Sequence, residues 1–108
     1  MPEIKVLVMY PRPTDEAEFE RRYLQEHVPL AMEKIKGAVK FGAVKVIGTP
    51  DGSTPPFFRI AELYFPSMEA LQQSVASAGT KEAVAHAFEI STGGPPVVMV
   101  CEQETTVF

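Results

Sequence analysis

Residues 57–65, with the sequence FFRIAELYF, are followed directly by Pro66 and Ser67. Branched and aromatic residues dominate this stretch, which is typical of a β-strand, and the proline ends it. The Ser67 hydroxyl can cap a helix, which we expect to run through Ala78. One strand leading into one helix is therefore the unit from which the rest of the chain can be interpreted.

A similar unit lies near the N-terminus. Residues 4–10 alternate around Lys5 and predict a strand that ends at Pro11, so LVMYP at residues 7–11 echoes ELYFP at residues 62–66. Asp15 followed by Glu18 is typical of a helix cap with its returning carboxylate. Two such halves predict a repeated β-α-β arrangement.

The remaining elements follow from turn residues. We expect a strand at 39–47, a loop at 48–56, a helix break at Gly79-Thr80, a helix from Thr80 to about residue 88, a turn at 93–96 and a strand from 97 to about 105. Pro29 should end or kink the first helix near Val28, and Gly37 should stop any continuation through Ile35. The order β-α-β-β-α-β predicts an α+β, ferredoxin-like, four-stranded antiparallel sheet in a single domain, residues 1–108.

Both faces of this sheet are apolar. The first strand carries Ile4, Val6 and Val8 on one side and Leu7 and Met9 on the other. Strand residues divide in the same way in the third strand (Phe58, Ile60 and Tyr64 against Ala61, Leu63 and Phe65) and in the fourth (Val97, Met99 and Cys101 against Val98 and Val100). Two helices cover one face only, so we expect a homodimer that packs sheet to sheet into a dimeric α+β barrel. Long loops that cover the face are the alternative.

Composition limits the function. The chain has 108 residues, a net charge of −4 and a pI of about 5.1. It lacks the basic stripe of a protein that binds nucleic acid or an anionic membrane, and we expect neither partner. A single cysteine excludes an intrachain disulfide, and two histidines make a metal site unexpected. No cofactor is indicated, and without a signal-like N-terminus we expect a cytoplasmic protein.

His27 is the first candidate for chemistry. Phe19, Tyr23 and His27 recur at helical spacing, so they share one stripe that should face the sheet. An imidazole in an interior cleft can act as a general acid or base. A structural histidine bonded to backbone or water has the same sequence pattern, so both interpretations stay open.

Other candidates are weaker. His86 lies among small residues in the second helical region and can contact a ligand, including a haem. Tyr10, Tyr23 and Tyr64 can line a pocket and offer hydroxyls, but the pattern favours an aromatic core residue with its hydroxyl at the rim for each of them. Glu62 can face the dimer space or pair with Arg59 or Lys45.

Several segments together resemble the EthD family. They are YP at 10–11, Asp15, Phe19, Tyr23, EHVPL at 26–30, Gly37, Phe41, AELYFPSMEAL at 61–71 and TGG at 92–94. The resemblance spans roughly residues 6–102, and the HVPL and ELYF pieces are its most specific parts.

The resemblance implies a dimeric α+β barrel and a place in breaking down small compounds. The family takes its name from a protein encoded with an ethyl tert-butyl ether-degrading cytochrome P450 system. Relatives in the wider superfamily include cofactor-free monooxygenases, muconolactone isomerases and haem-handling proteins, in which the ligand usually sits between helices and sheet. This implies His27 as the catalytic group, with Phe19, Tyr23, Tyr64 and His86 near the ligand. Family members often carry an acidic residue where this chain has His86.

Three hypotheses therefore stand at this stage. The first is a cofactor-independent oxidoreductase or isomerase that acts on a small apolar oxygenated compound through His27. The second is a binding or accessory protein without catalysis, and the third is a haem-binding relative.

Overall fold

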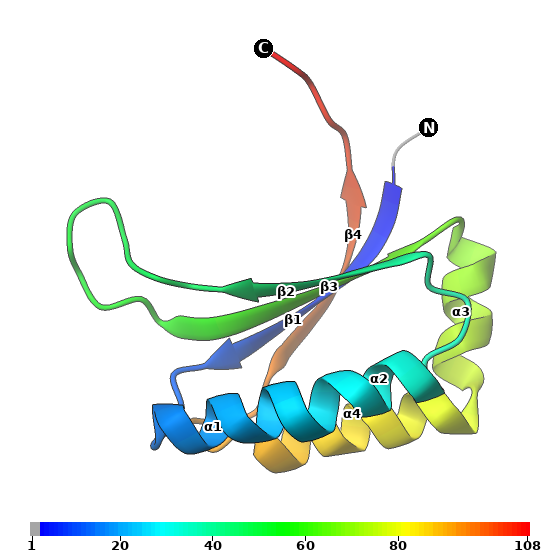
Figure 1. Cartoon of the computed structure of the whole chain (residues 1–108). Coiled ribbons are helices and arrows are strands. Elements are labelled where there is room, and N and C mark those ends of the chain that lie inside the picture. The colour runs from blue at the N-terminus through cyan, green and yellow to red at the C-terminus, as the bar shows by residue number, and fades with distance from the viewer. Residues whose placement is uncertain (1–2) are drawn as a thin grey trace.

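The structure, a computed structural model, describes residues 3–108. Residues 16–34 form one continuous helical segment that lies, together with a second helix, along one side of a twisted sheet, and a further helix stands at one end of them (Figure 1). In chain order the elements are β1 (Glu3–Pro11), α1 (Glu16–Arg22), the π-helix η1 (Tyr23–His27), α2 (Val28–Lys34), β2 (Lys40–Lys45), β3 (Phe57–Phe65), α3 (Met68–Ala76), α4 (Ala78–Ile90) and β4 (Val97–Gln103). None of the helices described is long and apolar enough to cross a membrane.

The four strands form one antiparallel sheet in the order β2-β3-β1-β4. The two strands that precede helices, β1 and β3, occupy its centre, as the repeated β-α-β arrangement requires. The predicted ferredoxin-like α+β fold is confirmed. Strands β2 and β4 are shorter than predicted and end at Lys45 and at Gln103.

The first helix does not end at Pro29. Asp15 caps it as predicted by accepting a hydrogen bond from the Glu18 amide, and the helical path then continues through η1 and α2 to Lys34. The wide π-turn allows this, since Val28 donates its amide to the Tyr23 carbonyl five residues back, just before the proline that has no amide to donate.

The break between α3 and α4 lies two residues earlier than predicted. Ser77, rather than Thr80, caps α4 by accepting a hydrogen bond from the Thr80 amide, so Gly79 lies inside the first turn. A Cβ atom on Gly79 would stand 2.5 Å from the carbonyl oxygen of Lys34, at the end of α2. Glycine is therefore required by the close approach of two helices and not by a helix break.

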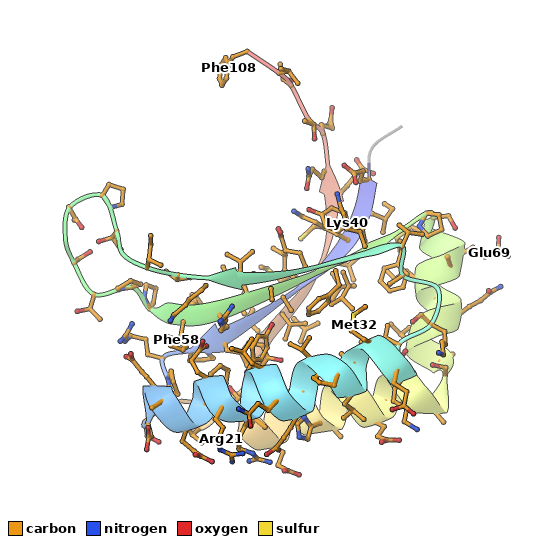
Figure 2. All side chains as sticks on the ribbon, in the orientation of Figure 1. Arg21, Met32, Lys40, Phe58, Glu69 and Phe108 are labelled. Carbon is orange, nitrogen blue, oxygen red and sulfur yellow. The ribbon has the colours of Figure 1, made fainter. Side chains whose placement is uncertain are left out.

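One face of the sheet packs on the helices. It carries Val6, Val8 and Tyr10 from β1, and Ala61, Leu63 and Phe65 from β3, with α1, η1 and α4 supplying the facing side chains. Phe58 was predicted on the other face, but a register shift between Tyr10 and Pro11 turns it into the core, where its ring lies 5.8 Å from Phe19. Figure 2 labels Phe58 between β3 and α1.

The opposite, open face of the sheet has no helix on it (Figure 1). Glu62 lies here and pairs with Lys5 at 2.8 Å, not with Arg59 or Lys45, both of which face the helices and pair with Glu20. Apolar side chains occupy much of the rest of this face: Leu7, Met9, Val44, Ile60, Val97, Met99 and Cys101.

Replacing Gly79 by alanine tests the close approach of the helices. Alanine favours a helix interior by about 1 kcal/mol over glycine, yet we expect Gly79→Ala to lower the free energy of unfolding by about 1–3 kcal/mol, because the Lys34 carbonyl must move. Urea unfolding at a fixed protein concentration measures the change. Gly48→Ala is the matched control, since nothing lies within 4 Å of its added Cβ, and a Gly79→Ala protein as stable as this control would contradict the account.

Candidate active site

The π-helix η1 places Tyr23 and His27 in the interior, where they continue the stripe that begins with Phe19 of α1. Phe19, Tyr23 and His27 are 3%, 0% and 6% exposed, so the predicted stripe faces the sheet. The stripe crosses from α1 into η1, and π-turns of this kind are frequent at functional sites.

Tyr10 of β1 lies at the centre of this cluster. Its ring contacts Phe19, Tyr23 and His27 edge-on, with centroids 5.3, 5.4 and 6.3 Å apart. The buried Arg59 guanidinium, held by two 2.7 Å bonds to Glu20, lies over the Tyr23 ring. Edge-on aromatic packing of this kind fixes ring orientations and so gives His27 a defined position.

Both ring nitrogens of His27 have side-chain partners. Nε2 lies 3.2 Å from the Tyr10 hydroxyl, and Nδ1 lies 2.9 Å from Nδ1 of His86 on α4. The two imidazole rings are nearly parallel, with 9° between their planes. On its other side, His86 places Nε2 3.7 Å from a carboxylate oxygen of Glu26. Four ionisable groups therefore form a continuous row from the core to the surface.

Burial sets the charge states in this row. Burial first, and the neighbouring His86 second, lower the pKa of His27 to about 4. Burial also raises the pKa of Tyr10 far above its usual value. The hydrogen bond from Arg22 lowers the pKa of Glu26. Near neutral pH the site thus holds a neutral imidazole, a phenol and a carboxylate.

A cavity of about 100 Å³ adjoins the row, between the helices and the sheet. Its walls are apolar apart from Tyr10, His27 and Thr80. Side chains of the sheet, among them Val6, Val8, Ala61 and Leu63, form one wall, and the small residues Ala31, Ala83 and Ala87 form the other.

The cavity opens at one side of the molecule. Four of its lining residues are half-exposed: Val75 of α3, Val84 and Phe88 of α4, and Val98 of β4. The entrance therefore lies between α3, α4 and the edge strand β4, and its rim is apolar.

Of the site residues predicted from sequence, only some lie at the cavity. His27 lines the cavity, whereas Phe19 and Tyr23 pack beside it without lining it. His86 contacts His27 and not the cavity. Tyr64 is on the open face, because its neighbours Leu63 and Phe65 face the helices, and it lies beneath the ammonium groups of Lys5 and Lys40.

Tyr10 is the site residue that the sequence interpretation assigned to the core and not to the pocket. It is buried, contacts His27 and lines the cavity. A signal was present, since Tyr10 is in phase with Val6 and Val8 along β1 and so must face the helices.

The structure also bears on the cofactor hypotheses. Among residues 3–108, no three His, Cys, Asp or Glu side chains come together as they would around a metal ion. A porphyrin is far larger than the cavity, and the His27 and His86 nitrogens that face each other are occupied by their mutual contact. The arrangement therefore gives no support to haem ligation.

Fold and site together define a ferredoxin-like α+β protein with a small apolar cavity and a histidine at its wall. The EthD domain model matches residues 11–87, and the chain belongs to the EthD family.

Relatives match almost the whole chain. An 11.0 kDa protein encoded in the thcB-thcC intergenic region of Rhodococcus erythropolis is 34% identical over 103 residues, which cover 95% of this chain and 96% of the relative. The crystal structure of an EthD family protein from Bacillus halodurans C-125 superposes with a TM-score of 0.86 at 26% identity, covering 94% of this chain and 99% of that one. An EthD-like protein from Ralstonia eutropha JMP134 gives a TM-score of 0.71 at 21% identity, covering 94% and 92%.

The low pKa of His27 should appear in the stability of the protein. Between about pH 6.5 and 4 the unfolded chain binds a proton that the folded chain does not. The stabilisation is complete above pH 6.5 and is lost as the pH falls towards 4, by roughly 3 kcal/mol for a difference of this size. We expect His27→Gln to remove this part of the pH dependence, measured by urea unfolding between pH 4 and 8. An unchanged pH profile in the variant would show that His27 has an ordinary pKa.

Proposed function

We propose that the protein binds a small, mainly apolar compound carrying one oxygen function, and that His27 transfers a proton to or from this compound without a cofactor. The observation that carries the proposal is the position of a neutral, buried imidazole at the wall of an otherwise apolar cavity. The neutral imidazole is the form that can accept a proton, and because burial lowers its pKa and so makes it a weaker base, its substrate must be a carbon acid activated by a neighbouring carbonyl group.

Two of the polar groups at the cavity wall, Tyr10 and His27, can act on the compound together. The Tyr10 hydroxyl can donate a hydrogen bond to a carbonyl oxygen, while His27 Nε2 takes a proton from the adjacent carbon. The electron pair of the C–H bond then moves towards the oxygen and forms an enolate, which Tyr10 stabilises. The Tyr10–His27 contact of 3.2 Å is long for a hydroxyl donor, so a ligand oxygen can replace it with little loss.

The cavity limits the size of the compound. An engineered apolar cavity of about 150 Å³ binds benzene, and the cavity of this protein is about 100 Å³. A compound of a few carbon atoms fits without rearrangement, and its apolar part would contact Ala83 and Ala87. Small lactones, phenols, and tert-butyl alcohols and ethers are the compounds to test first.

Filling the cavity should abolish binding. We expect Ala83→Leu, which projects into the cavity, to remove the thermal shift given by any bound member of this panel, since a ligand at 100 times its dissociation constant adds about 2.7 kcal/mol. For a domain of this size that is roughly 10 °C or more. Ala85→Leu, an exposed position on the same helix, should keep the shift. Equal shifts in both variants would place the ligand elsewhere.

His27→Gln separates catalysis from binding. The proposal requires that this variant still binds a lactone of the panel but no longer exchanges the proton on the carbon next to the lactone carbonyl with D₂O, as followed by NMR. Binding with no exchange in the wild type either would reduce the role to ligand binding.

We also propose that the open face of the sheet binds a second copy of the chain. The proposal draws on the apolar side chains of this face and on the Lys5–Glu62 pair, which neutralises its two charges within one copy. Two such faces can therefore meet without leaving Lys5 or Glu62 as an unpaired charge, while the Lys40 ammonium lies over the Tyr64 ring at the outer strand β2. A stable dimer buries roughly 800 Å² on each partner, which a four-stranded sheet face can supply.

A charge placed on the open face tests the dimer. We expect Met99→Lys, on this face of β4, to shift the mass measured by light scattering from two chains to one, because an unpaired ammonium cannot be buried there. Met32→Lys is the matched control, since Met32 is more exposed and lies on helix α2. A wild-type protein that is monomeric at micromolar concentration would refute the dimer.

A further inference from the structure

Within residues 3–108, His86 lies between His27 and the surface carboxylate of Glu26 and contacts both. It lies on α4 with a side chain that is 17% exposed, so one edge of the ring is in the core and the other reaches solvent. On the inner edge Nδ1 contacts His27 at 2.9 Å, and on the outer edge Nε2 faces Glu26 at 3.7 Å. The enolisation described above uses Tyr10 and His27 alone and gives His86 no task.

The contacts select one arrangement of ring protons. Two facing Nδ1 atoms need one donor and one acceptor between them. If His27 donates from Nδ1, its Nε2 accepts from Tyr10, and His86 keeps its proton on Nε2 and directs it at Glu26. If His86 donates instead, the Nε2 lone pair of His86 faces a carboxylate, which is repulsive. The first arrangement places a donor opposite an acceptor at every contact.

We propose that His86 and Glu26 relay protons between the buried His27 and solvent. This inference rests on the proposed acid–base function of His27 and adds the route by which that residue exchanges a proton with solvent. The route runs from Tyr10 and the cavity, through the two imidazole rings, to a carboxylate at the surface.

Each transfer conserves protons and charge. When His27 takes a proton from the compound at Nε2, it releases its other proton from Nδ1 to Nδ1 of His86, and His86 releases its Nε2 proton towards Glu26 and water. No buried imidazolium has to persist, which matters because burial disfavours that charged form. The reverse sequence returns a proton to the compound. Removal from one carbon and return to another would complete an isomerisation.

The surrounding charges hold the outer end of the route in place. Arg22 binds Glu26 at 3.1 Å and also binds Glu89 of α4 at 2.6 Å, while Arg21 binds Glu26 at 3.3 Å. These bonds link η1 to α4 and keep an ionised carboxylate beside His86. Towards the core, the groups that face the pair are the uncharged hydroxyl of Tyr10 and the ring of Tyr23.

The positions of the ring protons can be measured without any ligand. In protein labelled with ¹⁵N at its histidine rings, long-range ¹H–¹⁵N correlations at pH 7 should show His27 protonated on Nδ1 and His86 protonated on Nε2. Glu26→Gln, a surface change that leaves the core intact, should shift both residues towards the opposite proton positions. A wild-type His27 protonated on Nε2 would overturn the relay.

The exchange of the His27 ring proton with water measures the transfer itself. Proton transfer through a positioned side chain is typically worth about 10²-fold or more in rate, so His86→Leu should slow this exchange by about that factor. Glu82→Gln, on the exposed face of the same helix, should leave the rate unchanged. An unchanged rate in His86→Leu would overturn the proposal. Because neither readout uses a ligand, a negative result leaves the proposed function standing, whereas loss of ligand binding in the cavity test leaves the relay standing.

Discussion

The burial of one imidazole between β1 and α4 is the constraint on which the rest of the site depends. His27 reaches this position because the helix that carries it widens into a π-turn and then continues through Pro29 without a break. In an ordinary α-helical turn, the ring of Pro29 would clash with the carbonyl group four residues earlier, and one backbone hydrogen bond would be lost. With the wider turn, Tyr23 and His27 both face the sheet, and the aromatic rings around Tyr10 fix the direction in which each imidazole nitrogen points.

The fold could be predicted from local sequence patterns, because each helix cap and strand depends on residues that are close together in the sequence. The Asp15 and Ser67 caps, the strand at 57–65 and the echo between the two halves all appear in the structure as expected. The errors arose where a distant segment decided the outcome. Gly79 is explained by the Lys34 carbonyl, and the orientation of Phe58 by a shift in pairing with β1. Neither partner is near in sequence.

The candidate site could likewise be predicted only where it depends on spacing within one helix or one strand. Helical spacing alone placed His27 on the buried stripe, and strand phase could have placed Tyr10 opposite it. The contact between His27 and His86 joins residues 59 positions apart on different helices, and no spacing rule connects them. Tyr64, predicted near the ligand, does not line the cavity, because Leu63 and Phe65 on either side of it in β3 face the helices and Tyr64 itself faces the open side.

The entrance between α3, α4 and β4 has a consequence for how the molecule would work as an assembly. The entrance of the cavity is bounded by the helical layer and by one edge of the sheet, and the open face of the sheet is a separate surface. A second copy bound on that face would therefore leave each entrance unobstructed. Each chain would keep a complete chamber of its own, so that occupancy would follow a simple one-to-one isotherm with equal and independent sites, even though only the two stacked sheets would separate the two chambers.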